Sequence, residues 1–180
     1  MSRFAPFTVT TMPLPSPEQL IVRLADQIAP ILGAESTQIS ALVGIHTGGV
    51  WVMDALLARL GRDLPRGVLD ISFYRDDFSR IGLHPQVKPS DIPFDIEGRR
   101  VLLIDDVLYT GRTIRAAMNT LFDYGRPAAI RLAVLVDRGG REMPICPDFV
   151  GAHLELAEHE NIALTRADEG TLGFKVNNRA

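Results

Sequence analysis

The sequence has a single cysteine, Cys146, no long apolar run and no excess of basic residues. One cysteine excludes an internal disulfide and any metal site built from several thiolates, and it suits a reducing compartment. The apolar runs are too short to span a bilayer, and the N-terminus lacks the long apolar core of a signal peptide. We therefore expect a cytoplasmic protein without a membrane segment.

Charge and length limit the class of protein further. The formal net charge is −3, and the arginines are interspersed with acidic residues, which disfavours a dominant nucleic-acid-binding role. With 180 residues, of which 46% are hydrophobic and 23% charged, the chain can form one domain with a substantial core. We expect that domain to span 1–180, with 1–15 as an extended arm and 152–180 as a tail of short strands or irregular structure.

The apolar pattern predicts that strands and helices alternate through the middle of the chain. Ser16 to Gln19 has the pattern of a capping box, and apolar residues at helical spacing then run to Leu32, before Gly33. Further helices are expected at 50–60 and 113–124, and strands at 39–45, 68–74, 99–105 and 131–137. This alternation is typical of βαβ units, in which helices cover both faces of a mostly parallel sheet and ligands bind beyond the carboxyl ends of the strands.

The most informative segment joins one of these strands to a helix. A helix N-terminus presents backbone N–H groups and a positive dipole end to a phosphate, and Gly111 lets the backbone approach an anion closely. Thr110 and Thr113 add hydroxyl donors, while the adjacent Asp105 and Asp106 can accept hydrogen bonds from a vicinal diol. The segment therefore predicts a ribose-phosphate site. It comprises Val101, Leu102, Leu103, Ile104, Asp105, Asp106, Val107, Leu108, Tyr109, Thr110, Gly111, Arg112 and Thr113.

The specificity of this signal lies in the whole segment and not in its acids. An acid pair alone is a weak signal, because such pairs also cap turns or bind cations. The segment is not a Walker loop, which ends in Gly-Lys-Ser/Thr, and it lacks the Gly-x-Gly-x-x-Gly of a dinucleotide site.

Residues 101–113 resemble the motif with which type I phosphoribosyltransferases bind 5-phosphoribosyl-1-pyrophosphate (PRPP). The stretches 69–77 (LDISFYRDD), 91–113 and 132–142 (LAVLVDRGGRE) resemble the PyrR family of pyrimidine-operon regulators and uracil phosphoribosyltransferases. The similarity extends from about Pro17 to Gly151. It implies an α/β, type I phosphoribosyltransferase fold, with a central, mostly parallel sheet flanked by helices, a small hood and a flexible lid loop.

The resemblance also implies roles for individual positions. Asp105 and Asp106 would hold the ribose hydroxyls, and the turn from Tyr109 to Thr113 would hold the 5-phosphate. The pyrophosphate loop would be His46, Thr47, Gly48 and Gly49, and the base would be read by a segment beginning with Asp137, Arg138 and Gly139.

A lid is expected at 76–92, rising from Arg75, Asp76 and Asp77. A long connection without periodicity inside a compact domain is usually functional, which independently favours this interpretation. Arg75 would either neutralise the leaving pyrophosphate or form an ion pair with Asp76 or Asp77. The candidate catalytic residues are therefore Asp105, Asp106 and Arg75.

The implied reaction is loss of magnesium pyrophosphate from C1 of PRPP and capture of that carbon by uracil N1, which gives UMP. Mg²⁺ would be held mainly by substrate oxygens, without a direct protein ligand. Purine-using relatives commonly have an acid two residues before the glycine of the motif, where this chain has Tyr109, so a pyrimidine is favoured. Relatives assemble as dimers or larger, so we expect a homodimer or a higher homo-oligomer.

The family also contains proteins that bind the leader of their own pyrimidine messenger RNA and respond to UMP and UTP. This chain departs from them: Gly140 replaces a histidine, Cys146 and Ala152 lie near positions of basic residues, and 46–49 replaces Arg-Thr-Arg-Gly. Lost phosphate contacts would lower RNA affinity. We therefore favour an enzyme first, an RNA-binding attenuation regulator second and a catalytically weak nucleotide sensor third.

Overall fold

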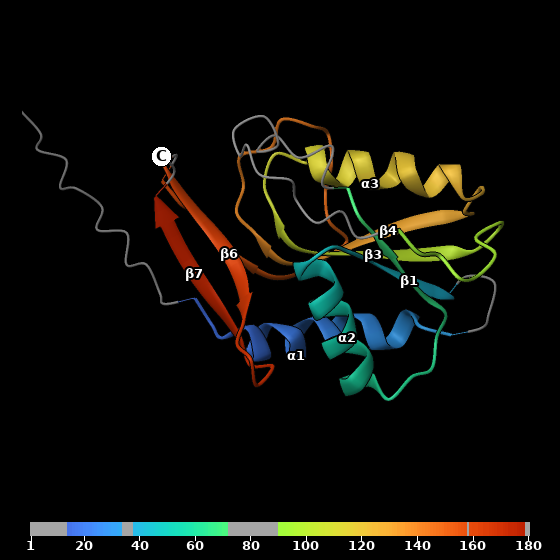
Figure 1. The fold of residues 1–180 in the computed structure, drawn as a ribbon, viewed down its shortest axis with the longest axis horizontal. Helices are drawn as coiled ribbons and strands as arrows, with labels where there is room; N and C mark the ends of the chain where they lie inside the picture. The colour runs from blue at the N-terminus through green and yellow to red at the C-terminus, as the bar shows by residue number, and fades with distance from the viewer. Residues whose placement is uncertain (1–13, 34–37, 72–89, 158, 179–180) are drawn as a thin grey trace, which may run out of the picture.

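The computed structural model describes residues 14–33, 38–71, 90–157 and 159–178 (Figure 1). The helices are α1 (Pro17–Ile28), a short 3-10 turn (Ala29–Ile31), α2 (Gly48–Leu60) and α3 (Arg112–Asp123). The strands are β1 (Ala41–Ile45), β2 (Arg66–Leu69), β3 (Arg100–Leu108), β4 (Ala129–Asp137), β5 (Phe149–His153), β6 (Glu160–Arg166) and β7 (Leu172–Asn178).

Within these ranges, a five-stranded parallel sheet has the order β2-β1-β3-β4-β5. Figure 1 shows α1 and α2 on one face of this sheet and α3 on the other. The antiparallel hairpin β6–β7 stands at one side and contacts α1 through β7. The predicted α/β architecture, a parallel sheet with helices on both faces, is confirmed.

Each face of the sheet has its own apolar core, and β3 contributes to both. Leu102 and Ile104 pack in the core shared with α1 and α2, whereas Val101 and Leu103 pack in the core shared with α3. Successive side chains of a strand point to opposite faces, which explains the alternation. Because both faces are covered, the strand reads as a continuous apolar run in the sequence.

Helix α1 is shorter than predicted. It ends at Ile28 and continues only as a 3-10 turn, because the ring nitrogen of Pro30 has no hydrogen to donate to the preceding helical turn. Leu32 is nevertheless buried and forms an isolated parallel bridge with Ile39.

Strand β3 is longer than predicted. It was expected to end at Asp105 but continues to Leu108, because β4 stays paired with it as far as the Leu108 and Asp137 partners. The acid pair therefore lies within the strand and not in a loop after it.

Several predicted segments fall partly or wholly outside the described residues. These include most of the N-terminal arm, residues 72–74 of the strand predicted at 68–74, and the lid up to residue 89 with Arg75, Asp76 and Asp77. In the described part of that strand the predicted bounds were wrong, because β2 begins at Arg66 and ends at Leu69. At the described end of the lid, Asp91 forms an antiparallel bridge with Val68. The predicted tail contains the β6–β7 hairpin. No helix in the described ranges has the length and apolar character needed to cross a membrane.

Candidate functional site

The acids of the motif face opposite sides of the sheet. Asp105 continues the α3-facing series of β3 and is 4% exposed, and its Oδ1 accepts a hydrogen bond from the Asp106 N–H at 3.0 Å. Asp106 is half-buried on the α2-facing side, where a methyl group at Gly48 would overlap its carboxylate. Asp106 therefore presents a carboxylate beside the start of α2, while Asp105 steadies the backbone of its neighbour.

The turn after β3 leads directly into α3. Gly111 occupies the N-cap position with a φ of +89°, a conformation that side chains other than glycine's disfavour, and a Cβ there would lie 3.1 Å from Met143 Cβ. Because Gly111 has no side chain, it cannot cap the Thr113 and Ile114 N–H groups. The Thr110 hydroxyl oxygen accepts from the Arg112 N–H at 3.3 Å, which leaves the hydroxyl hydrogen available to donate. This turn offers an anion a set of donors and a helix dipole.

Helix α2 offers a similar set of donors at the same edge of the sheet. It begins at Gly48, just after the end of β1, and its N-cap residue Thr47 makes no side-chain capping bond. A Cβ on Gly49 would overlap the Ile104 carbonyl oxygen, so the glycine allows the loop to lie directly against β3. The His46–Thr47 peptide bond is cis, and the His46 N–H donates to the Leu69 carbonyl at 2.8 Å.

Asp137, at the end of β4, is already engaged. It is 7% exposed, both of its carboxylate oxygens accept from Arg141 Nη2 at 2.6 Å, and Oδ1 also accepts from the Gly139 N–H at 3.0 Å. His153 Nδ1 lies 3.8 Å from the other oxygen. Reading a base through this carboxylate would require some of these bonds to be given up.

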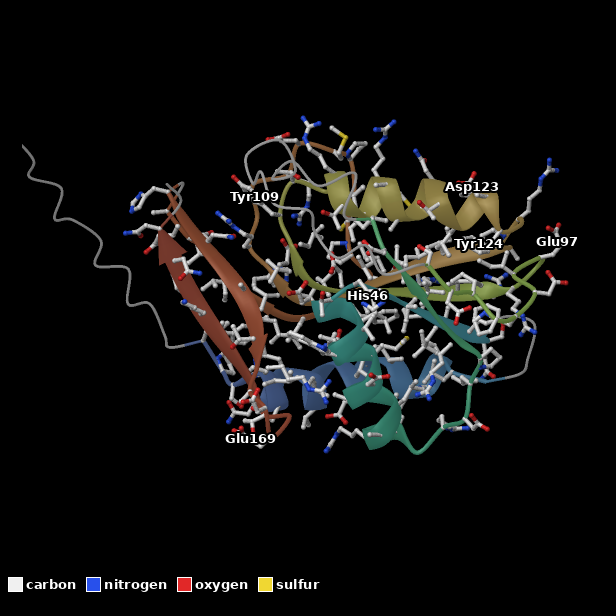
Figure 2. The ribbon with its side chains drawn as sticks, in the orientation of Figure 1. His46, Glu97, Tyr109, Asp123, Tyr124 and Glu169 are labelled. Carbon is white, nitrogen blue, oxygen red and sulfur yellow. The ribbon has the colours of Figure 1, made fainter. Side chains whose placement is uncertain are left out.

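Arg138 connects the motif to the hairpin. Its guanidinium carbon lies 3.8 Å from the centroid of the Tyr109 ring, and Nη1 donates to Asn161 Oδ1 on β6 at 3.2 Å. Gly140, with a φ of +72°, lies against the same ring, and a Cβ there would overlap it. Figure 2 labels Tyr109 near the upper end of the hairpin and His46 near the start of α2.

Sequence reasoning missed two of these contacts. Arg141 lies four residues after Asp137, the acid at the end of the strand, and this spacing could have suggested an ion pair. Asn161 gave no local signal, because it lies 23 residues from Arg138 in the chain.

The structure brings together the predicted residues at the ends of β1, β3 and β4. These are the loop 46–49, the acid pair, the turn 109–113 and the segment 137–139. The candidates Arg75, Asp76 and Asp77 lie outside the described residues.

The donors present fit a magnesium ion that binds mainly through its substrate. Within the described ranges, no three His, Cys, Asp or Glu side chains are grouped so as to hold a metal. Mg²⁺ commonly takes one or two carboxylates together with substrate phosphates, and Asp106 supplies a half-buried carboxylate beside the uncapped start of α2.

A cavity of about 640 Å³ opens at the opposite edge of the sheet. Arginines and acids line it in equal number, including Arg62, Asp63, Glu97 and Arg100, so it has no preference for one sign of charge. Ligands of parallel α/β sheets bind at the carboxyl ends of the strands, and we therefore place the substrate site at the motif.

Comparisons with known proteins show to which family the chain belongs. Residues 17–163 match the phosphoribosyl transferase domain family. The chain is 55% identical over 154 residues to the bifunctional protein PyrR of Pseudomonas fluorescens, covering 86% of this chain and 92% of that protein. The chain belongs to the PyrR family. A further PyrR, from Nitrosococcus oceani, is 59% identical over 130 residues, which cover 71% of this chain and 73% of that protein.

Solved structures show the same fold. A hypoxanthine phosphoribosyltransferase from Staphylococcus aureus is 25% identical with a TM-score of 0.59, covering 80% of this chain and 76% of that one. The corresponding enzyme from Trypanosoma cruzi is 26% identical with a TM-score of 0.60, covering 79% and 77%. The predicted PyrR family, type I phosphoribosyltransferase fold and phosphoribosyltransferase activity are therefore confirmed.

Proposed function

We propose that this PyrR-family protein transfers the phosphoribosyl group of PRPP to N1 of uracil, forming UMP and pyrophosphate. The observation that carries the proposal is that β1 and β3 end at the same edge of the sheet. Each leads there into a helix without a side-chain cap, and Asp106 lies beside Gly48 at the start of α2. PRPP carries a phosphate at C5 and a pyrophosphate at C1. A ligand with an anion at each end and hydroxyls between them matches this arrangement of donors and carboxylate.

Each of the two helix starts would bind one of the two anionic groups of PRPP. The turn 109–113 would bind the 5-phosphate through the Thr113 and Ile114 N–H groups and the Thr110 hydroxyl. The loop 46–49 would bind the pyrophosphate through backbone N–H groups at the start of α2. These backbone donors do not depend on the arginines that occur in this loop in some relatives.

The carboxylates would act on the sugar. Asp106 accepts hydrogen bonds from the ribose hydroxyls, and its negative charge favours the positive charge that develops at C1 as the bond to pyrophosphate breaks. The bonding electrons leave with pyrophosphate, uracil N1 forms the new bond to C1, and the N1 proton passes to the departing pyrophosphate. Mg²⁺, bound mainly through substrate oxygens, would neutralise charge on the leaving group.

The base would bind beside the Arg138–Tyr109 stack, bordered by the segment 137–139 and by Asn161 of the hairpin. Tyr109 stands where purine-using relatives have an acid, which favours a pyrimidine. Closure of a lid at 76–92, with Arg75 near the leaving group, would exclude water that competes for C1.

The direct test uses purified protein with PRPP, Mg²⁺ and uracil, and measures UMP formation. Orotate, hypoxanthine and guanine serve as competing bases. We expect UMP to form and uracil to be used in preference to the other three. No UMP formation, or preferential use of a purine, would contradict the proposal.

RNA binding is the second candidate function, favoured by the 53–59% identity to proteins named bifunctional PyrR. We rank it second because Gly140, which lies against the Tyr109 ring, stands where many RNA-binding members have a histidine. A gel-shift experiment with a pyrimidine leader RNA, with and without UMP and UTP, tests it. We expect little or no shift at physiological salt, and a salt-sensitive shift enhanced by UMP would reverse the ranking. Assembly as a homodimer or larger remains an expectation.

A further inference from the structure

We propose that Arg141 is a positioning residue that holds the phosphate-binding turn. Its side chain is 23% exposed, and each nitrogen of its guanidinium donates to a different neighbour. Nη2 bonds both carboxylate oxygens of Asp137 at 2.6 Å, Nη1 bonds the Tyr109 carbonyl at 2.5 Å, and Nε bonds the Ile145 carbonyl at 3.1 Å. Arg141 therefore joins the end of β4 to the peptide that enters the turn.

The two ends of this connection differ in rigidity. Asp137 is the last residue of β4 and is paired in register with Leu108 of β3, so it belongs to the sheet. Tyr109 is the first residue beyond β3, and its carbonyl belongs to the peptide unit that leads into Thr110. A bond from a sheet-anchored arginine to that carbonyl fixes the peptide plane from which the turn starts.

The segment around Arg141 supports the same turn at its next carbonyl. The Glu142 and Met143 N–H groups donate to the Thr110 carbonyl at 2.9 and 3.0 Å. The Glu142 carboxylate also forms an ion pair with Arg112 Nε at 2.7 Å, where α3 begins. These contacts approach the turn through its carbonyl oxygens and through Arg112, and they leave the Thr113 and Ile114 N–H groups unused.

The geometry requires an arginine. A planar guanidinium carries donors that point in several fixed directions, whereas a lysine ammonium is a single point on a flexible stem. Lysine at position 141 could keep the pair with Asp137 but could not also reach the Tyr109 and Ile145 carbonyls. Loss of the arginine would also leave the buried Asp137 carboxylate without its principal partner.

This inference rests on the proposed function, because the turn is proposed to hold the 5-phosphate of PRPP. Displacement of such a turn by even a small distance weakens binding and turnover, commonly by one to two orders of magnitude. The KM for PRPP should rise because the Tyr109 carbonyl that Arg141 bonds leads into the phosphate-binding turn. The KM for uracil can change as well, because Arg141 also bonds Asp137 in the segment 137–139.

The test compares Arg141→Ala, Arg141→Lys and a matched control, Arg131→Ala. Arg131 lies on the same strand as Asp137 and pairs with Asp148 at 2.7 Å, but it is 53% exposed and far from the turn in register. Hydrogen exchange of the ligand-free proteins is followed by mass spectrometry over peptides spanning 106–115. The Michaelis constants for PRPP and uracil, kcat and the melting temperature are measured on the same preparations.

We expect Arg141→Ala to accelerate exchange in 106–115 while exchange in α1 stays unchanged. The KM for PRPP should rise by roughly tenfold to a hundredfold. Arg141→Lys should give intermediate values, and it supplies the same measurements if the alanine variant does not fold. Arg131→Ala should behave like the wild type.

Unchanged exchange in 106–115 would overturn the inference, as would a lower melting temperature with an unchanged KM for PRPP. The exchange measurement needs no substrate, so it decides the role of Arg141 even if the wild type makes no UMP. The absence of UMP would instead count against the proposed function.

Discussion

Helix α1 begins differently from α2 and α3. At the start of α1, Ser16 Oγ accepts from the Gln19 N–H at 3.3 Å, and Gln19 Oε1 accepts from the Ser16 N–H at 3.1 Å. Glu18 adds a negative charge in the same turn. The residues at the starts of α2 and α3, which the structure describes in full, include no N-cap side chain that makes such a bond and no acid in the first turn.

At the start of α1, the chain's own side chains bond the backbone N–H groups of the first turn. At the starts of α2 and α3, these N–H groups remain available to a ligand. A capping side chain typically contributes about 1 kcal/mol to stability. The starts of α2 and α3, at the carboxyl edge of the sheet, lack this contribution, and the start of α1 has it. We therefore propose that phosphates complete the uncapped N–H groups at this edge of the sheet.

The largest expected effect follows from closing the space beside α2. Gly48→Ala places a methyl group into the Asp106 carboxylate, so the loop 46–49 and the acid must move apart. We expect kcat/KM for PRPP to fall by about a hundredfold, the usual consequence of misplacing a binding group by about an ångström. Steady-state kinetics at varied PRPP measures the change.

The control for this variant lies at the other end of the same helix. Gly61 has a φ of +57°, and nothing lies within 4 Å of the position that a methyl group would take there. Gly61→Ala should therefore cost about 1 kcal/mol of stability through its backbone conformation alone. Its kinetics should match the wild type. Equal kinetic losses for both glycine variants would show that the start of α2 has no special role.

The next effect concerns the Asp106 carboxylate beside the start of α2. Asp106→Asn keeps the shape of the side chain but removes the charge. It should lower kcat/KM for PRPP by a factor that corresponds to about 1.5–3 kcal/mol of lost transition-state stabilisation, the usual value of a hydrogen bond to a charged group. Asp54→Asn, at an exposed position on α2, is the control. Unchanged kinetics for Asp106→Asn would exclude a direct role of this carboxylate in holding the ribose.

The smallest effect concerns the capped helix. Ser16→Ala removes the acceptor for the Gln19 N–H and should lower the free energy of unfolding by about 1 kcal/mol, as measured by urea denaturation. The KM for PRPP should stay the same, because this helix start is not expected to bind a phosphate. A rise in the KM for PRPP would mean that the presence or absence of a side-chain cap does not distinguish the helix starts that bind phosphate.

Local features of the fold could be predicted from the sequence. The capping box at Ser16, the alternation of strands and helices, and the turn at Gly111 all depend on residues close together in the chain. The strand boundary at Asp105 was wrong because two acids resemble the beginning of a loop. Pairing with β4, a partner from elsewhere in the chain, keeps β3 extended to Leu108.

Features that depend on distant contacts could not be predicted. The order of the strands, the approach of Asn161 to Arg138 and the bond from Arg141 to Tyr109 all join segments far apart in the sequence. Opposite facing of the acid pair also became clear only once both residues were placed within a strand. The roles of the candidate site residues themselves stay predictions.

The central claim is that the starts of α2 and α3 bind the two anionic ends of PRPP. The most direct measurement is a titration of the ¹⁵N-labelled protein with PRPP and Mg²⁺, following backbone amide signals by NMR. We predict that the Gly48, Gly49, Thr113 and Ile114 signals shift most and that the Gln19 signal in the capped turn of α1 does not. Saturable shifts elsewhere, with these four signals unchanged, would contradict the claim.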